Sequence, residues 1–146
     1  MKTAITSALK QRIINHEGLR LKPYRCSANK LTIGVGRNLD DVGLSETEAY
    51  YLLDNDLKAC ENVCQYTFPW FEKLNILRQG IIIEMVFNLG IIGFLGFKKM
   101  IKALSIQDFA GASQEMIDSR WAKQVGQRAN RLSLMMKTGK EVNTQC

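Results

Sequence analysis

The sequence is poor in the residues that most metal sites need, and it has no compact cysteine motif. It contains one histidine, His16, and four cysteines, none of them in a CxxC pair. A structural zinc site uses four Cys or His ligands, commonly in closely spaced pairs. We therefore expect no metal and no other cofactor. We interpret Cys60, Cys64 and Cys146 as small apolar residues in a reducing compartment.

Long uninterrupted apolar segments are also missing. The most apolar stretch, residues 81–97, is interrupted by Glu84, Asn88 and three glycines. A membrane-spanning helix needs about 20 predominantly apolar residues. Residues 1–15 lack the continuous apolar core of a signal peptide. We expect no stable membrane association, and we interpret 81–97 as a buried helix, a turn and a second short helix.

The composition is that of an ordinary folded protein with an excess of positive charge. Hydrophobic residues make up 46% of the 146 residues, charged residues 23%, and the net charge is +6. The basic residues are scattered, which fits a solvated surface or attraction to nucleic acid, anionic lipid or cell wall. Because no stripe of alternating basic and aromatic residues is present, we expect no nucleic-acid partner. The chain length indicates one compact unit, and we expect a monomer.

Apolar periodicity and capping signals predict a mainly helical chain with one hairpin. Residues 5–13 place apolar side chains at helical spacing, and Gly18 is a plausible stop for that helix. Turn-forming residues within 24–36 predict a short antiparallel hairpin. Ser45 and Glu48 form a capping box that starts a helix reaching about Gln65. Further helices are predicted over 74–89, over 97–104, from a cap at 105–108 to about 119–121, and over 127–137.

Three residues near the N-terminus have a spacing that suits glycoside hydrolysis. Glu17 is followed, after eight residues, by Cys26, and after five more by Thr32. A general acid needs a rigid mount near the scissile oxygen, and a group that positions water must face it across the sugar. A carboxylate at a helix end, opposite a glycine-rich hairpin that carries a hydroxyl, meets both needs.

This spacing resembles that of the phage-type lysozymes, the muramidases of glycoside hydrolase family 24. Their signature is Glu, eight residues, usually Asp, five residues and Thr, so Cys26 departs from it. Later segments also resemble the family in the right order: Met85-Val86-Phe87-Asn88-Leu89-Gly90 followed by Gly96-Phe97, then Ser119-Arg120-Trp121, then Arg128-Ala129-Asn130-Arg131. The resemblance covers about residues 5–140.

The resemblance implies an α+β, lysozyme-like fold in a single domain, residues 1–146. Its hairpin lobe would span about 18–43, its bridging helix 44–65, and its helical lobe 1–17 and 66–146. The implied activity is that of an endolysin, which hydrolyses the β-1,4 bond between N-acetylmuramic acid and N-acetylglucosamine in peptidoglycan, generally with inversion. Such an enzyme accumulates in the host cytoplasm and reaches the cell wall through a holin-type pore.

The resemblance also assigns roles to the three spaced residues. Glu17 would be the general acid, and Thr32 would position the attacking water. Cys26 stands where the family usually has aspartate, and it has three interpretations. It can act as a thiolate base or nucleophile, be a passive occupant, or mark an enzyme that no longer hydrolyses. Basic neighbours such as Lys22, Arg25 and Lys30 would help the first of these by lowering the pKa of the thiol. We favour participation, because the family occasionally has Cys at this position.

Further roles follow from matching positions in the family. Arg128 matches an arginine that orients the catalytic glutamate. Arg37 and Asp56 match a structural ion pair between the hairpin lobe and the long helix. The saccharide subsites would be lined by Asn38, Phe87, Met100 and Glu115, of which Met100 and Glu115 differ from the usual polar, uncharged residues.

Two other functions stay open. A lytic transglycosylase cleaves the same bond with one glutamate and no aspartate, because a hydroxyl of the substrate displaces the leaving group. A protein that binds peptidoglycan or nucleic acid without catalysis is the second alternative. Product mass separates the first alternative from hydrolysis, and binding to sacculi without clearing would indicate the second.

Overall fold

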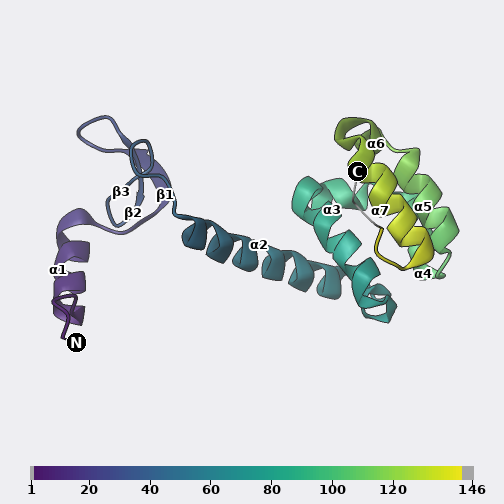
Figure 1. The fold of residues 1–146 in the computed structure, drawn as a ribbon, viewed down its shortest axis with the longest axis horizontal. Helices are drawn as coiled ribbons and strands as arrows, with labels where there is room; N and C mark the ends of the chain where they lie inside the picture. Colours follow the sequence, from purple (N-terminus) through teal and green to yellow (C-terminus); the bar gives the residue numbers. More distant parts are fainter. Residues whose placement is uncertain (1, 143–146) are drawn as a thin grey trace. The chain divides into compact units, whose positions relative to one another are not determined.

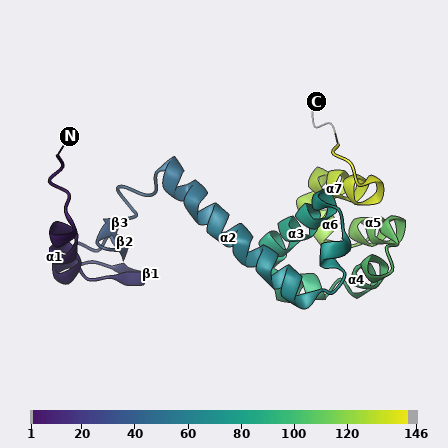
Figure 2. The ribbon, with the colours of Figure 1, turned by 90° about the horizontal axis from the view of Figure 1, so that it is seen from below.

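A computed structural model describes residues 2–142, and the chain divides into two compact units, Met1–Tyr51 and Leu52–Cys146. The described residues form seven α-helices and one three-stranded antiparallel sheet (Figures 1 and 2), which confirms the α+β class. The division groups α1 with the sheet. The expected placement of residues 1–17 in the helical lobe concerns the relation between units and stays a prediction.

The first unit opens with helix α1, Ser7–Glu17. The Thr6 hydroxyl caps it by accepting the Leu9 N–H at 3.1 Å. Gly18 ends it with φ 80°, a backbone angle that glycine adopts without steric cost. Its N–H donates to the Ile14 carbonyl at 2.8 Å. The predicted helix and its glycine stop are confirmed, and the stop places Glu17 at the last helical residue.

The sheet follows at once, with strands β1 (Arg20–Arg25), β2 (Leu31–Gly34) and β3 (Arg37–Asn38) in that order. Thr32 on β2 pairs with Tyr24 on β1 and with Asn38 on β3, so it occupies the middle of the sheet. The predicted hairpin is confirmed. The third strand was not predicted, because two residues are too few to show an alternating pattern.

Helix α2, Glu46–Thr67, begins with the predicted capping box. The Glu48 N–H donates to Ser45 Oγ at 3.1 Å, and Glu48 Oε1 accepts the Ser45 N–H at 2.8 Å. The helix extends two residues beyond the predicted end. Its residues belong to both units, and its role as a bridge between lobes stays a prediction.

The second unit is helical, with a short 3-10 turn. Its elements are η1 (Phe71–Lys73), α3 (Ile76–Leu95), α4 (Lys98–Ser105), α5 (Phe109–Ile117), α6 (Arg120–Val125) and α7 (Gln127–Thr138). Side chains from all the α-helices of this unit, α2 included, form one apolar core. Ile82, Met85, Phe94 and Leu104 are fully buried there. The strong packing of these helices accounts for the larger share of the fold's hydrophobic stabilisation.

Helix α3 supplies much of this core. By length and hydropathy alone it is long and apolar enough to cross a membrane. Five of its twenty side chains are buried inside the unit. Gly90, with φ 74°, interrupts the helix, so the predicted sequence of helix, turn and short helix is confirmed.

Helix α6 differs from the sequence prediction, which ended a helix at about 119–121. Ser119 instead caps a new helix, because its hydroxyl accepts the Ala122 N–H at 3.1 Å. The preceding helix, α5, starts from Asp108, inside the predicted cap. The last helix, α7, ends at Gly139 in the left-handed conformation, close to the predicted end.

Candidate active site

Glu17 is the last residue of α1, and its exposed side chain lies beside the turn that joins β2 to β3. A Cβ atom added at Gly36 would lie 3.0 Å from Glu17 Oε2, so the carboxylate lies directly beside this glycine. Gly36 has φ +68° and Gly34 has φ +69°, so both ends of the turn adopt a conformation that favours glycine. The Gly-rich turn therefore provides both the bend and the space that the Glu17 side chain occupies.

Cys26 follows β1 and opens the turn into β2. The Asn29 N–H donates to the Cys26 carbonyl at 2.8 Å, and the Cys26 N–H donates to the Lys30 carbonyl at 3.0 Å. The thiol is free and half-buried. The backbone N–H of Lys30 lowers the pKa of this thiol most, followed by the N–H of Ala28 and the hydroxyl of Thr32. Hydrogen bonds to the thiolate favour the charged form, which is the form that accepts a proton or attacks.

Thr32 is buried in the middle of the sheet, with 3% of its surface exposed. Its hydroxyl donates to the Lys30 carbonyl at 2.8 Å. A hydroxyl has one proton, which the Lys30 carbonyl accepts here, and its lone pairs stay free to accept a further hydrogen bond. The Cys26 N–H also donates to the Lys30 carbonyl, at 3.0 Å, so the structure brings Cys26 and Thr32 together at one acceptor, and it places Glu17 in the same unit.

The amide of Asn38 is engaged in its own loop. Its Nδ2 donates to Asp41 Oδ2 at 3.0 Å, and its Oδ1 accepts the Asp41 N–H at 2.9 Å. Asp40 holds the same loop to the sheet by accepting the Leu31 N–H at 2.8 Å. An amide with two donors and two lone pairs keeps capacity for one further contact of each kind. The subsite role of Asn38 stays a prediction.

Arg37 is paired with Glu48 in this structure. Its two terminal nitrogens contact the two carboxylate oxygens at 2.8 and 2.7 Å, and Nη1 also donates to the Gly43 carbonyl at 3.1 Å. Arg37 and the Ser45 cap together lower the pKa of Glu48 to about 2. The expected partner, Asp56, belongs to the other unit, and a pair with it stays a prediction. Glu48 was missed because its role in the capping box already explained its position.

Arg128 has a partner within the second unit. Its Nε donates to Glu84 Oε2 at 2.8 Å. This pair lines a groove of about 610 Å³ between α2, α3 and α7, together with Phe87, Leu57 and Ile83. The predicted orienting contact with Glu17 would join the two units and stays a prediction. The observed pair shows that Glu84 competes with Glu17 as a partner for the Arg128 guanidinium.

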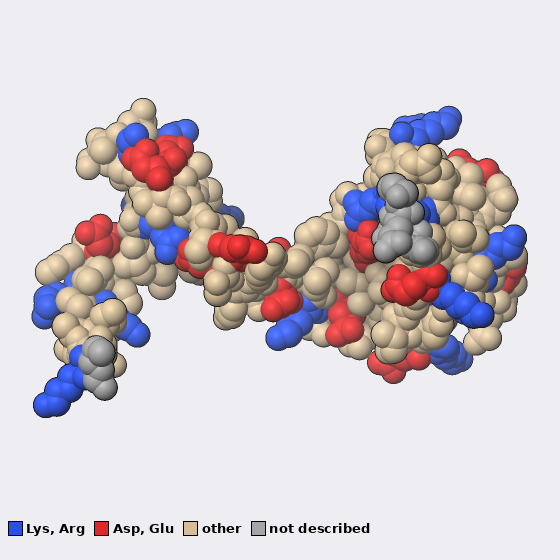
Figure 3. Space-filling model, viewed as in Figure 1, with Lys and Arg blue, Asp and Glu red and all other residues tan. Residues whose placement is uncertain are grey.

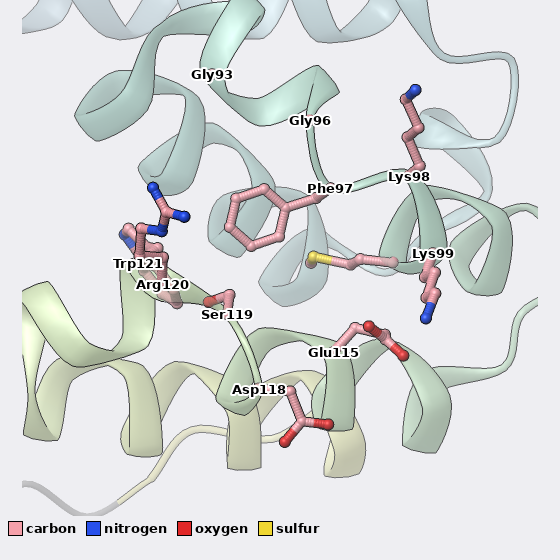
Figure 4. A pocket seen from close by; sticks show the side chains of 11 residues that line it. Gly93, Gly96, Phe97, Lys98, Lys99, Glu115, Asp118, Ser119, Arg120 and Trp121 are labelled. Atoms are coloured by element: carbon pink, nitrogen blue, oxygen red, sulfur yellow. The ribbon is translucent and has the colours of Figure 1, made fainter.

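Met100 and Glu115 lie at a second cavity of about 670 Å³, formed by residues of α3, α4, α5 and α6. Met100 is fully buried, so little of its side chain is accessible to a ligand. Glu115 is half-buried. Figure 4 shows Phe97 at the centre of this cavity, with Lys98 and Lys99 on one side and Arg120 on the other. The structure thus separates these two positions from Phe87, and their saccharide contacts stay predictions.

This second cavity is the larger of the two, but it contains none of the three residues with the glycosidase spacing. Of the rim charges at 98, 99, 118 and 120, only Arg120 belongs to a motif named in the sequence, Ser119-Arg120-Trp121. The doublet of lysines after Gly96 and Phe97 was the signal available. No group of three or more potential metal-binding side chains occurs among residues 2–142.

The surroundings of Cys60 and Cys64 disfavour the reactive thiolate form. Cys64 is fully buried, and burial raises the pKa of its thiol to about 11. Burial also raises the pKa of the half-buried Cys60. Cys146 lies outside the described residues. Among the described cysteines, only Cys26 has a lowered pKa, which separates its chemistry from that of the other two.

Residues 14–138 match the family described as phage lysozyme, and the chain belongs to that family. It is 26% identical to "Probable T4-type lysozyme 1" of Dictyostelium discoideum, over 92% of this chain and 96% of that protein. It is 32% identical to an endolysin of Acyrthosiphon pisum secondary endosymbiont phage 1, over 76% of this chain and 75% of that protein. A SAR-endolysin of Escherichia phage Mu is 29% identical, over 82% of this chain and 68% of that protein.

Family membership identifies the chain as a lysozyme-type glycosidase whose substrate is peptidoglycan. The expected class of enzyme is thereby confirmed. The family match does not establish which bond is cleaved or which residues cleave it.

Proposed function

We propose that the protein is an endolysin that hydrolyses the β-1,4 bond between N-acetylmuramic acid and N-acetylglucosamine. Glu17 acts as general acid, and Cys26 with Thr32 acts on the attacking water. The observation that carries this proposal is that the Cys26 N–H and the Thr32 hydroxyl both donate to the Lys30 carbonyl, in the same unit that places Glu17 beside Gly36. A proton donor and a group that activates water are the two functions an inverting glycosidase requires.

The chemical step is a single displacement at the anomeric carbon. Glu17 gives its proton to the glycosidic oxygen as the bond from that oxygen to the anomeric carbon breaks. A water molecule forms the new bond from the opposite face, and its proton passes to the Cys26 thiolate. Solvent then returns a proton to Glu17 and removes one from Cys26, so both groups regain their starting states.

Thr32 contributes by position. Its hydroxyl is buried and fixed by the Lys30 carbonyl, so the oxygen has a defined place from which to accept a hydrogen bond from the water. Because the water is ordered before it attacks, less entropy is lost on reaching the transition state, and the activation barrier is lower. The lowered pKa of Cys26 supplies the base that the family's aspartate would otherwise provide.

The route to the substrate is part of the same proposal. Two of the similar proteins are named as endolysins of phages. The protein would act as a monomer, accumulate in the host cytoplasm and reach the wall through a holin-type pore, with no stable attachment to the membrane. Expression in cells with and without an inducible holin tests this route, because lysis should require the holin.

Product analysis on purified sacculi tests the reaction itself. Hydrolysis adds water and leaves a reducing sugar that borohydride converts to an alditol. A lytic transglycosylase leaves a 1,6-anhydro sugar, which lacks that water and does not react. The replacement of the usual aspartate by Cys26 is the feature that favours this alternative. Mass spectra dominated by anhydro products would replace hydrolysis by transglycosylation, and sacculi bound without any soluble product would indicate a binding protein.

A further inference from the structure

The Lys30 carbonyl links the two residues that are proposed to act on the attacking water. The Thr32 hydroxyl donates to it at 2.8 Å, and the Cys26 N–H donates to it at 3.0 Å. This carbonyl and the N–H of Leu31 belong to one planar, trans peptide group, so they point in opposite directions. Any contact that fixes the Leu31 N–H therefore also fixes the direction of the Lys30 carbonyl.

The side chain of Asp40 holds this peptide group from the side opposite to the carbonyl. Asp40 Oδ2 accepts the Leu31 N–H at 2.8 Å. Leu31 begins β2, whereas β3 ends at Asn38, and the acceptor is a carboxylate rather than a backbone carbonyl of the third strand. A hydrogen bond to a charged acceptor is stronger than one to a neutral acceptor. It also polarises the peptide group, which makes the Lys30 carbonyl a better acceptor.

Asp40 lies on the loop after β3, and ion pairs attach this loop to the turn between β1 and β2. Arg25 Nη1 donates to Asp40 Oδ2 and to the Asn29 carbonyl, each at 3.4 Å. Lys30 pairs with Asp41 at 3.2 Å. Figure 3 shows acidic and basic side chains side by side at the sheet end of the first unit. Because both ion pairs are exposed, each adds little to stability, and the bond to the backbone is the contact that orients the peptide group.

We propose that Asp40 is a positioning residue for the proposed reaction. By holding the Lys30–Leu31 peptide group, it fixes the acceptor of the Thr32 hydroxyl. Through the same carbonyl, it fixes the turn that carries the Cys26 thiol. Asp40 acts through these groups and not on the substrate. This inference rests on the proposed function, and all the contacts that carry it lie within the first unit.

Kinetics of Asp40 variants test this role. Asp40→Ala removes the acceptor, and we expect kcat on soluble peptidoglycan fragments to fall roughly tenfold or more. KM should change little, because the ordering of water is lost rather than the binding of substrate. Asp40→Asn keeps an amide oxygen that can accept the Leu31 N–H, so it should retain most of the turnover. If the Asn variant is as impaired as the Ala variant, charge rather than the bond to Leu31 is responsible, and the proposal fails.

The pH dependence of Cys26 alkylation gives a readout that does not require turnover. With Cys60, Cys64 and Cys146 changed to Ala, iodoacetamide reports the formation of the Cys26 thiolate. Asp40→Ala should raise the midpoint by about half a pH unit or more, because the N–H groups of the turn are then less well directed at the sulfur. Loss of a negative charge alone would lower the midpoint. An unchanged or lowered midpoint would therefore contradict the proposal.

Two control variants separate positioning from loss of charge and loss of stability. Asp41→Asn removes the same charge from the same loop but leaves the Leu31 N–H bonded to Asp40, so the alkylation midpoint should stay or fall slightly. Glu48→Gln breaks the pair with Arg37 and should destabilise the same unit without raising the midpoint. A rise in either control as large as that in Asp40→Ala would refute a specific role for Asp40.

A longer side chain extends the test if Asp40→Ala is unfolded by circular dichroism. Asp40→Glu keeps the charge, but its extra methylene displaces the carboxylate from Leu31. It should lower kcat and raise the alkylation midpoint, and a Glu variant equal to the parent in both would overturn the proposal. Product analysis of the parent enzyme reports on the proposed function separately. Anhydro products would overturn hydrolysis, while the alkylation midpoint would still show whether Asp40 orders the turn.

Discussion

The carboxylate of Glu17 lies so close to Gly36 that a Cβ atom at this glycine would be 3.0 Å from Oε2. The turn between β2 and β3 therefore borders the side chain of the proposed general acid. The contact joins the end of a helix to the end of a hairpin, nineteen residues apart in the sequence.

Gly36→Ala should lower the rate of sacculus hydrolysis by displacing the Glu17 side chain. Gly34→Ala is the matched control, because its φ of +69° imposes similar backbone strain while nothing lies within 4 Å of the added Cβ. Both changes should cost about 1–3 kcal/mol of stability. Only Gly36→Ala should lose additional activity per folded molecule, roughly tenfold or more. Equal losses in kcat would mean that strain, not the contact, controls activity.

Glu17→Gln should abolish the clearing of a cell suspension and leave the melting temperature unchanged or slightly raised. A neutral amide cannot protonate the glycosidic oxygen, and general acid catalysis contributes about 10²–10⁴-fold. Glu17 makes no ion pair among the described residues, so little folding energy depends on its charge. Substantial turnover by a folded Glu17→Gln protein would remove this residue from the mechanism.

Cys26→Ala and Cys26→Ser should lose much more activity than Cys26→Asp, because only aspartate restores a basic group. In the parent, activity should rise with pH as the thiol ionises, below the pH of an ordinary cysteine because its pKa is lowered. Cys26→Asp should move this rise to lower pH, since a carboxylate ionises near pH 4. Rates measured from pH 4 to 9 would show the shift.

Iodoacetamide should inactivate the parent enzyme with the same pH dependence. The test requires a background with Cys60, Cys64 and Cys146 changed to Ala, so that Cys26 is the one reactive thiol. Full activity of Cys26→Ala, or of the alkylated enzyme, would make the thiol a bystander. Glu17 and Thr32 would then have to suffice.

Glu48→Gln should lower the melting temperature at neutral pH and leave turnover per folded molecule nearly unchanged. The folded pKa of Glu48, about 2, lies below the ordinary value of 4.5. Its charge therefore stabilises the fold above about pH 4.5, and this contribution is lost as the pH falls toward 2. The parent should lose stability through that window, and Glu48→Gln should lose less.

Asp56→Asn is the companion to this experiment. The family resemblance predicts that it lowers stability, while the observed Arg37–Glu48 pair predicts a smaller effect than Glu48→Gln. Thermal unfolding of both variants ranks the two carboxylates. A larger loss in Asp56→Asn would identify Asp56 as the principal partner of Arg37.

Arg78→Met should destabilise the second unit by about 2 kcal/mol. Arg78 Nε donates to the Met136 carbonyl at 2.7 Å, and Nη2 donates to the Lys137 carbonyl at 3.1 Å. The guanidinium also lies 3.6 Å from the centroid of the Phe109 ring. Arg78→Lys keeps the charge but cannot reproduce both bonds, so it should recover part of the loss in urea unfolding. No change in Arg78→Met would mean that α7 is held by its apolar face alone.

Local signals in the sequence predicted the elements that depend on neighbours a few residues apart. The capping box at Ser45 and Glu48, the glycine stop at Gly18 and the end of α7 at Gly139 were each predicted within a few residues. Their hydrogen bonds close within four residues along the chain, so composition and spacing suffice to identify them. The spacing of Glu17, Cys26 and Thr32 is likewise a local signal, because all three residues lie in one short segment.

Tertiary structure alone decided which charged groups meet and which side chains are buried. The family resemblance assigned Asp56 to Arg37 and Glu17 to Arg128, and both pairs stay predictions, whereas within each unit the structure pairs these arginines with Glu48 and Glu84. Met100 shows the same limit, because its complete burial depends on helices packed from distant parts of the chain. The packing of the elements decides which carboxylate lies within reach of each arginine, and spacing along the chain does not encode that packing.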